Sequence, residues 1–431
     1  MKHFFILLLS FLAILCQGQD LDKDARIGLK FLMIDNPTFS KGFTGFQLYN
    51  PKTEKLLYDS NGDKYFTPAS NTKIFTLLSA LEILPDSLPT IHYTIRGDKL
   101  IFSGTGDPTF LNDLFDSTSS RAFQFLQESD LELYYAPKPL EDETYGPGWA
   151  WDDYAYYFQC EKATFPIYGN LAKASFENGA YKMTPNFTNI RIDNEQPYPV
   201  IREEEENIFT INPSLSLNRS FEYYIPFEYS DSLFLKLLKD TLQKPIQLYL
   251  NKIDLDKSIA SHHADSVYKV LMHESDNFIA EQLLLMCANE LKDTFDVSIS
   301  IKEIRDQHFD NDDLSFQWVD GSGLSRYNLM SPRDLIDALG KIYKNVSWER
   351  IKTIFALGAN LPALSVANTN QAPFVFAKTG SLKNKFCVSG FVETKRNGIL
   401  IFSFMHNNYI GSSEPVALEL NRILNYIRNK Y

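Results

Sequence analysis

The chain has 431 residues, of which 44% are hydrophobic and 22% charged, and its formal net charge is −12. This length allows a large core and two or more domains, and the composition is that of a globular protein. An acidic chain without a basic cluster is a poor match for nucleic acid or an anionic membrane, so we expect no nucleic-acid partner.

The first 18 residues resemble a secretory signal. Lys2 supplies the positive end, and the largely apolar run from Phe4 to Leu15 is too short to span a bilayer, which needs about 20 residues. We expect cleavage after Gly18; lipid attachment to Cys16 is the alternative, and the large Leu15 before it argues against that. No later segment is apolar enough to span. The sequence therefore predicts an exported, periplasmic protein, soluble or loosely membrane-associated.

A loop that turns into a helix is predicted around Ser70. Pro68 disfavours helix before it, an apolar run follows, and Pro85 ends the pattern. We expect Ser70 or its neighbour to cap the first turn, with Lys73 on the same face at the positive end of the helix dipole. A lysine can activate a serine if desolvation or a second cation lowers its pKa. Alone, the pattern equally fits a capped helix with a solvated lysine, and residues 266–269 repeat it.

Local periodicity predicts the other elements. We expect a hairpin at 43–59, a strand pair at 91–96 and 100–102, a mostly β segment from about 101 to 254, helical periodicity at 266–291 and 333–343, strands at 375–377, 386–393 and 398–405, and an amphipathic helix at 415–427. Three cysteines remain after the signal, which is too few for a disulfide framework, and we expect Cys287 and Cys387 to be buried.

Two further short motifs complete a pattern. Ser275-Asp276-Asn277 lies between two helical runs, and Lys378-Thr379-Gly380 ends a short β run. Each is weak alone. In this order and context, together with the motif at Ser70, they form the triplet of class A β-lactamases and penicillin-binding proteins.

Each part of the triplet has a task in acyl transfer. Ser70 Oγ would attack a carbonyl, and Lys73 would accept its proton if Lys378 and its surroundings keep the Lys73 amine neutral. Ser275 is placed to relay a proton to the departing amine. Asn277 can hold both Lys73 and the amide of the substrate.

Substrate binding is assigned to the third motif. Lys378 and Thr379 would pair with a terminal carboxylate, and Gly380 would let the strand approach the substrate closely. The backbone N–H groups of Ser70 and Ser381 would form the oxyanion hole. The seven histidines show no metal-binding spacing, and we expect no metal or cofactor.

The chain resembles the DacB-like D-alanyl-D-alanine carboxypeptidase/endopeptidases, the class C low-molecular-mass penicillin-binding proteins. The likeness extends over residues 43–406 and is carried, in the order of the family, by residues 66–73, 104–109, 146–153, 275–282, 320–326 and 378–382. It implies an α/β fold with a serine β-lactamase/transpeptidase-like domain, an antiparallel five-stranded sheet flanked by helices. The implied parts are a signal peptide at 1–18, a discontinuous catalytic domain at 19–100 and 255–431, and an inserted, mostly β region at 101–254.

The resemblance also implies a substrate and its inhibitors: peptidoglycan stem peptides cleaved through an acyl-Ser70 intermediate, with β-lactams as covalent inhibitors. Asp153, Phe158 and Arg326 match positions that line a pocket for the diaminopimelate side chain in relatives. A carboxylate and a guanidinium suit a zwitterionic amino-acid terminus. Asp153 would equally fit a helix cap or a surface acid.

Two alternatives stay open. A serine β-lactamase has the same triplet, although no counterpart of the class A deacylating glutamate can be assigned. A non-catalytic peptidoglycan-binding scaffold could keep the fold, but it would have no need of both lysines. The insertion is shorter than in the best-known relatives, so one inserted domain is expected to be reduced or missing. The oligomeric state is not predicted.

Overall fold

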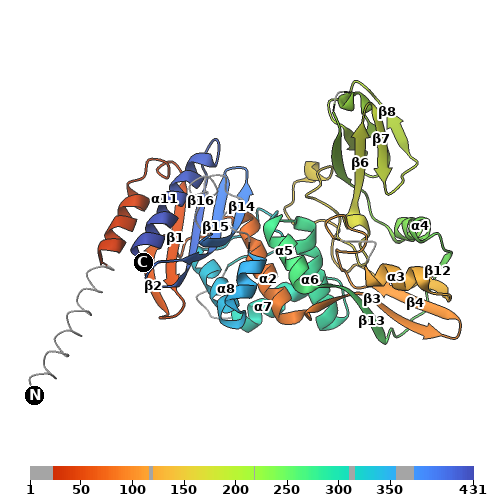
Figure 1. The fold of residues 1–431 in the computed structure, drawn as a ribbon, viewed down its shortest axis with the longest axis horizontal. Coiled ribbons are helices and arrows are strands. Elements are labelled where there is room, and N and C mark those ends of the chain that lie inside the picture. Colours follow the sequence, from red (N-terminus) through yellow and green to blue (C-terminus); the bar gives the residue numbers. More distant parts are fainter. Residues whose placement is uncertain (1–22, 116–119, 218, 310–315, 356–372) are drawn as a thin grey trace, which may run out of the picture. The chain divides into compact units, whose positions relative to one another are not determined.

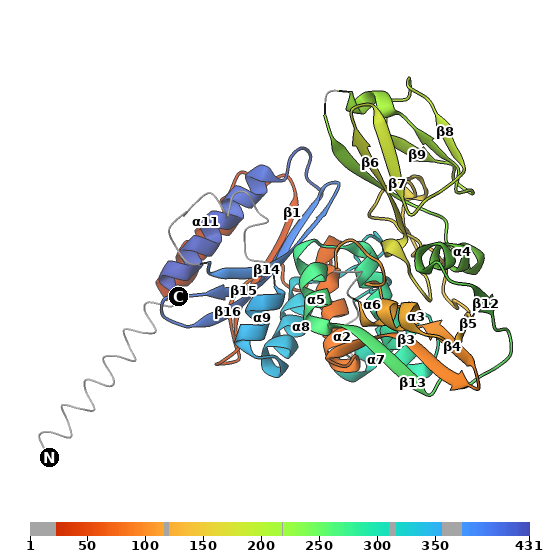
Figure 2. The same cartoon turned by 45° about the vertical axis from the view of Figure 1, so that its right-hand side comes forward.

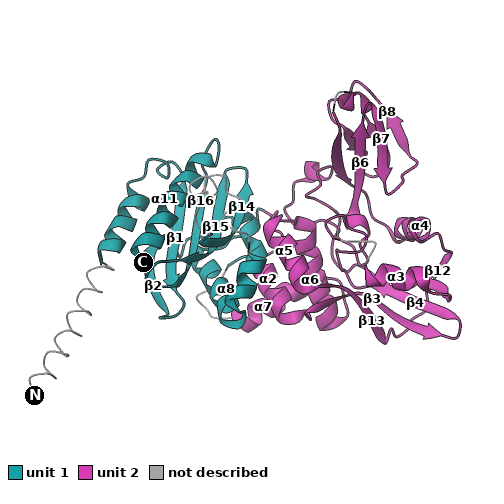
Figure 3. Ribbon diagram, viewed as in Figure 1, with its two compact units in different colours: residues 1–74, 313–318, 326–431 teal, residues 75–312, 319–325 magenta. Residues whose placement is uncertain are grey.

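The computed structural model describes residues 23–115, 120–217, 219–309, 316–355 and 373–431. The predicted signal, its cleavage site and Cys16 lie outside the described residues. The chain forms two compact units (Figure 3): unit 1 comprises residues 1–74, 313–318 and 326–431, and unit 2 comprises residues 75–312 and 319–325. These boundaries differ from the expected domains because the helices after residue 264 group with residues 101–254. The predicted discontinuous catalytic domain stays a prediction.

Unit 1 is built on a five-stranded antiparallel sheet with the strand order β14-β15-β16-β1-β2. Its strands are β1 (Phe43–Asn50), β2 (Lys55–Ser60), β14 (Val375–Leu382), β15 (Lys385–Glu393) and β16 (Ile399–Asn407). Phe46 of β1 lies opposite Phe404 of β16, so the predicted hairpin and the predicted C-terminal strands join in one sheet. β14 lies at one edge of this sheet.

Helices cover both faces of this sheet (Figures 1 and 2). The helix of residues 23–34 and α11 (Glu414–Lys430) lie on one face, and α8 (Pro332–Asn345) and α9 (Trp348–Ile354) lie on the other. Val388 packs in the core under α11, whereas Phe391 contacts Trp348 of α9. Because both faces are covered, β15 is buried from residue 386 to 392 without the alternation of a half-exposed strand. The apolar stripe predicted for 415–427 is buried, as expected.

The described residues of unit 2 form one larger and two smaller sheets. The larger sheet has the order β12-β5-β4-β3-β13, and the smaller ones have the orders β11-β6-β7 and β8-β10-β9. The strands are β3 (Ser87–Arg96), β4 (Lys99–Gly104), β5 (Glu132–Tyr135), β6 (Leu171–Glu177), β7 (Ala180–Thr184), β8 (Ile190–Ile192), β9 (Val200–Arg202), β10 (Phe209–Ile211), β11 (Phe221–Pro226), β12 (Ile246–Leu248) and β13 (Lys257–His263). Strands outnumber helices within residues 101–254, and the inserted domain with these bounds stays a prediction.

In the described part of unit 2, two helices lie between the strands in the chain, and three follow the last strand. They are α3 (Arg121–Glu128), α4 (Asp231–Leu242), α5 (Ala264–His273), α6 (Asn277–Lys292) and α7 (Val297–His308). α6 is buried along most of its length, because every residue from Phe278 to Asn289 is shielded from solvent. Cys160, Cys287 and Cys387 are buried free thiols. Within the described residues, no helix combines the length and the apolar character that crossing a bilayer requires.

Candidate active site

Ser70 lies in the 3-10 turn η1 (Ala69–Thr72), which leads directly into α2 (Lys73–Ile83). The expectation that a serine caps this helix is wrong: no side chain caps the turn, which begins after Pro68. Ala69 has a φ of +50°, a left-handed conformation that is uncommon outside glycine. The Ser70 hydroxyl is therefore not engaged as a cap, and its Oγ accepts a hydrogen bond from Lys73 Nζ at 3.1 Å.

Both lysines of the predicted site are buried. The exposed fraction of Lys73 is 0% and that of Lys378 is 1%. Burial, with the positive charge of Lys73 as the second cause, holds the pKa of Lys378 well below its usual range. Lys378 Nζ also donates to the carbonyl of Thr379 at 2.9 Å. Two charged amines repel each other in a desolvated site, and this repulsion adds to burial in disfavouring the charged form of Lys378.

The Asn71 side chain fastens η1 to the sheet. Its Nδ2 donates to the carbonyl of Lys378 at 3.1 Å and to that of Cys387 at 3.3 Å. The backbone of β14 also approaches the serine turn closely at Gly380, since a Cβ there would lie 2.6 Å from the carbonyl oxygen of Pro68 and 2.9 Å from Asn71 N. The sequence reasoning missed Asn71; its only signal was its place between Ser70 and Lys73.

The third motif lies within β14, not at its end. The strand was predicted for 375–377, but it continues to Leu382 and pairs Thr379 with Val388 and Gly380 with Cys387 of β15. Ser381 is exposed on the same strand. An edge strand is the kind of element to which an extended peptide can add by main-chain hydrogen bonds. Unit 1 thus brings together the predicted nucleophile, both lysines and the predicted substrate strand.

The second motif lies in unit 2, at the break between α5 and α6. Ser275 has a φ of +59°, and the next residue, Asp276, caps α6 by accepting from Ile279 N at 2.7 Å. Asn277, the first residue of α6, donates from Nδ2 to the carbonyl of Phe158 at 3.0 Å. The Ser-Asp-Asn motif therefore lies at a helix junction, as expected, and its Asn277 is hydrogen-bonded to the main chain of Phe158.

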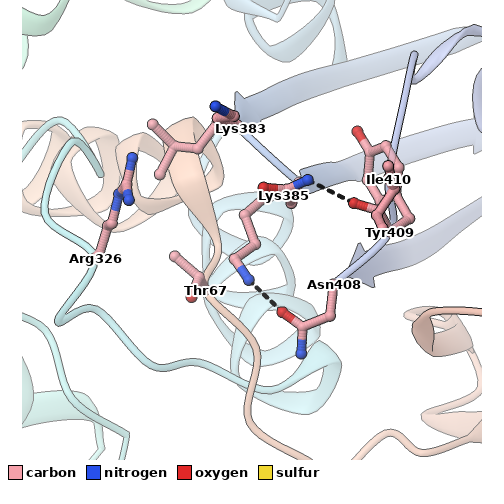
Figure 4. Close-up of a pocket in the computed structure, with 9 residues that line it drawn as sticks. Thr67, Arg326, Lys383, Lys385, Asn408, Tyr409 and Ile410 are labelled. Carbon is pink, nitrogen blue, oxygen red and sulfur yellow. Dashed lines mark hydrogen bonds between the residues drawn. The ribbon is translucent and has the colours of Figure 1, made fainter.

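The remaining predicted substrate residues are placed separately. Asp153 is half-buried in the short turn η2 (Trp151–Asp153), and the ring of Phe158 stacks on Tyr156 with 5.4 Å between centroids. Arg326 is exposed in unit 1, where it lines a pocket of about 490 Å³ (Figure 4). Unit 2 thus holds two of the three residues, and unit 1 holds the third.

The pocket beside Arg326 begins where β14 ends and carries two further cations, Lys383 and Lys385. Figure 4 shows the Lys385 ammonium directed at Asn408, to whose Oδ1 it donates at 2.5 Å. Burial, opposed by Cys387 and assisted by the charge of Arg326, lowers the pKa of Lys385. Sequence reasoning missed both lysines, because a turn lysine has no pattern that separates it from a solvated one.

Across the described residues, no group of three or more His, Cys, Asp or Glu side chains could hold a metal ion.

The sheet with helices on both faces, and the buried Lys–Ser pair at its edge, define the class as serine β-lactamase/transpeptidase-like. The sequence profile of the D-Ala-D-Ala carboxypeptidase 3 (S13) family matches residues 27–423, and the chain belongs to that family. It is therefore a serine-type D-Ala-D-Ala carboxypeptidase, as the resemblance predicted.

Individual relatives agree with this membership. The D-alanyl-D-alanine carboxypeptidase DacB of Haemophilus influenzae is 24% identical, with 90% of each chain covered. The crystal structure of penicillin binding protein 4 (dacB) from the same organism is similar at 21% identity with a TM-score of 0.72, covering 92% of this chain and 98% of the other. A second structure of it, complexed with a β-lactam, gives 19% identity and a TM-score of 0.69 over 93% and 99% of the two chains.

Proposed function

We propose that this peptidase removes the terminal D-Ala of peptidoglycan stem peptides, or cuts D,D cross-links, through an acyl ester on Ser70. The observation that carries the assignment is the 3.1 Å hydrogen bond between Lys73 Nζ and Ser70 Oγ, in a place where neither lysine of the site is exposed. A hydroxyl becomes a nucleophile when an adjacent base can take its proton.

In the first step, Ser70 Oγ attacks the carbonyl carbon of the penultimate D-Ala while its proton passes to the neutral Lys73 amine. The tetrahedral oxyanion is held by the backbone N–H groups of Ser70 and Ser381. The C–N bond then breaks, and the departing D-Ala amine takes up a proton. Water hydrolyses the ester in the second half of the reaction and restores the free serine.

The second motif supplies the leaving-group step in this proposal. Ser275 relays the proton to the amine, and Asn277 holds the Lys73 ammonium and the substrate amide. Their assignment rests on the motif and on its place at the N-terminus of α6. The φ of +59° at Ser275 is an energetically unfavourable backbone conformation, and such conformations cluster at active sites.

The third motif binds the substrate. On binding, the terminal carboxylate of the substrate favours the charged form of Lys378 and pairs with its ammonium and with the hydroxyl of Thr379, while the backbone of Gly380 lies against the extended peptide. β-Lactams would acylate the same serine as substrate mimics. The β-lactam bound to the Haemophilus influenzae protein supports this part of the proposal.

Recognition of the acyl side is assigned to Asp153, Phe158 and Arg326, which would bind the zwitterionic end of a diaminopimelate side chain. The exposed guanidinium at the pocket of Figure 4 supports the carboxylate half of that recognition. In Asp153→Ala, cleavage of diaminopimelate peptides should fall by about 10- to 150-fold, since a charge-assisted contact contributes about 1.5–3 kcal/mol, while cleavage of simple D-Ala-D-Ala mimics is kept. Equal loss on both substrates would contradict the assignment.

The location proposed is the periplasm, after export. The apolar run from Phe4 to Leu15 supports this proposal. Mass spectrometry of the mature protein isolated from cells should give the mass of a chain that begins at Gln19. The mass of a chain with a lipid-modified Cys16, or of an uncleaved chain, would contradict cleavage after Gly18.

Release of D-Ala from a stem pentapeptide tests the function directly. Wild-type protein should release it, and Ser70→Ala should lower the rate by at least about 10³-fold, as expected for loss of a nucleophile. Ser266→Ala is the matched control, because Ser266 and Lys269 repeat the spacing in α5 and Ser266 Oγ only donates to the carbonyl of His263. Activity retained in Ser70→Ala, or lost in Ser266→Ala, would overturn the assignment.

A further inference from the structure

The loop of residues 320–325 in unit 2 is held by side chains. Asp320 folds it: Oδ1 accepts from Gly323 N at 2.9 Å, and Oδ2 accepts from Ser325 N at 2.6 Å. The indole Nε1 of Trp149 also donates to Asp320 Oδ2 at 2.9 Å. Such a loop has little freedom to change shape, because two of its main-chain N–H groups are bound to one buried carboxylate.

A second carboxylate binds this loop to α6. Glu281 accepts from Gly321 N at 3.0 Å and from Ser322 N at 2.8 Å. The loop approaches the helix so closely that a Cβ at Gly321 would lie 2.7 Å from the carbonyl oxygen of Ala280. Glycine is therefore required at this position, and the contact is one of backbone against backbone.

The opposite side of the loop binds α2. Thr76 Oγ1 donates to the carbonyl of Gly321 at 2.6 Å, so this peptide segment bonds to both helices. Thr76 lies one turn after Lys73, the first residue of α2, and Glu281 lies one turn after Asn277, the first residue of α6. The loop is a bracket between the two helices that begin with predicted catalytic residues.

The surroundings of Glu281 disfavour its charged form. Glu281 and Asp320 are each 1% exposed, and burial, followed by repulsion from Asp320, raises the pKa of Glu281 to about 7. The buried Lys162 opposes this rise, and its own Nζ pairs with Asp142 at 2.7 Å. A neutral glutamine would avoid this desolvation and repulsion. It cannot accept both loop hydrogen bonds in the same way, however, because it has one acceptor oxygen and would place its NH₂ group against one of the two loop N–H groups.

We infer that Glu281 is a positioning residue for the peptidase reaction: through the 320–325 loop its carboxylate fixes α6, which starts at Asn277, to α2, which starts at Lys73. The inference rests on the proposed acyl transfer at Ser70. It assigns a role to the 320–325 loop, which takes part neither in the nucleophile nor in the substrate strand.

The rate of acylation by benzylpenicillin measures this role. Glu281→Gln should lower the second-order rate by about tenfold or more at a temperature where circular dichroism shows a folded protein, because small displacements of catalytic groups are expensive. Glu290→Gln is the matched control, since Glu290 is an exposed glutamate on the same helix. A folded Glu281→Gln protein that is acylated at the wild-type rate would overturn the inference.

Thr76→Val gives an independent test from the α2 side, because valine keeps the shape of threonine and removes the donor to Gly321. It should lower the acylation rate severalfold. If both contacts act through one bracket, the Glu281→Gln/Thr76→Val double variant should lose little more than the worse single variant. Rate losses that multiply would contradict a shared bracket. If Glu281→Gln is too unstable to measure, a wild-type acylation rate in Thr76→Val would by itself overturn the inference.

The pH dependence separates positioning from simple support of the fold. The charged groups that face Glu281 are Asp320 and Lys162, the latter paired with Asp142. Protonation of Glu281 removes a hydrogen-bond acceptor for the loop. The acylation rate of the wild-type protein divided by that of Glu281→Gln should therefore fall toward one as the pH falls through about 7. A ratio that stays constant from pH 5 to 9 would contradict the role of the carboxylate. Wild-type protein that forms no adduct would instead overturn the proposed function.

Discussion

Gly380→Ala tests how closely the serine turn must approach the substrate strand. The new Cβ would lie 2.6 Å from the carbonyl oxygen of Pro68 and 2.9 Å from both nitrogens of Asn71. Reaching an ordinary contact near 3.4 Å requires a separation of about 0.8 Å, and two of these three atoms are backbone that cannot rotate away. Overpacking of this kind costs about 1–3 kcal/mol of unfolding free energy.

The larger effect should be on catalysis, because the displaced turn carries Ser70. A shift of this size should lower the rate of benzylpenicillin acylation by about 10²-fold, measured beside thermal melting. Gly340→Ala in α8 is the matched control: its Cβ would meet nothing within 4 Å, so the acylation rate should be unchanged and helix propensity should add up to about 1 kcal/mol of stability. If Gly380→Ala is acylated at the wild-type rate, the close approach is not needed for chemistry.

Three other variants test the charges and contacts of unit 1. Burial holds the pKa of Lys378 low, so the unfolded chain takes up a proton that the folded chain refuses; Lys378→Met should melt a few degrees higher at pH 7, by a margin that closes toward pH 10, while acylation is lost. A lower melting temperature at pH 7 would refute this. Burial also lowers the pKa of His406 to about 4 from 6.5, so stability should fall by about 3 kcal/mol between pH 6.5 and 4. In His406→Gln that component should disappear, and an NMR titration with a pKa near 6.5 would contradict it. Asn71→Ala leaves the carbonyls of Lys378 and Cys387 without this donor and should lower the unfolding free energy by about 1–3 kcal/mol; unchanged melting would refute the fastening role.

The sequence predicted elements whose cause is local. The hairpin at 43–59, the strand pair near Gly97 and the stripe of α11 follow from turn residues and periodicity, and the structure has all three. The helix of residues 23–34, whose Ala25, Leu29 and Met33 pack in the core of unit 1, was not predicted.

Features that depend on pairing across the chain were not predictable in this way. The strand at 375–377 continues through Lys378 and Gly380, residues of low strand propensity, because β15 pairs with every position. The 3-10 turn at Ser70 likewise depends on Asn71, whose partners lie more than 300 residues further along the chain. The motif assigned the residues to one chemistry, but only the packing of η1 on β14 shows how Ser70 and Lys378 come to share one environment.

Intact-mass spectrometry of the purified protein with and without benzylpenicillin, followed by peptide mapping, tests the central claim most directly. We predict a stable adduct of one drug molecule on Ser70 in the wild-type protein, and none in Ser70→Ala. An adduct on another residue, or no adduct with the drug left intact, would contradict an acyl-Ser70 mechanism. Rapid consumption of the drug without a lasting adduct would identify a β-lactamase instead.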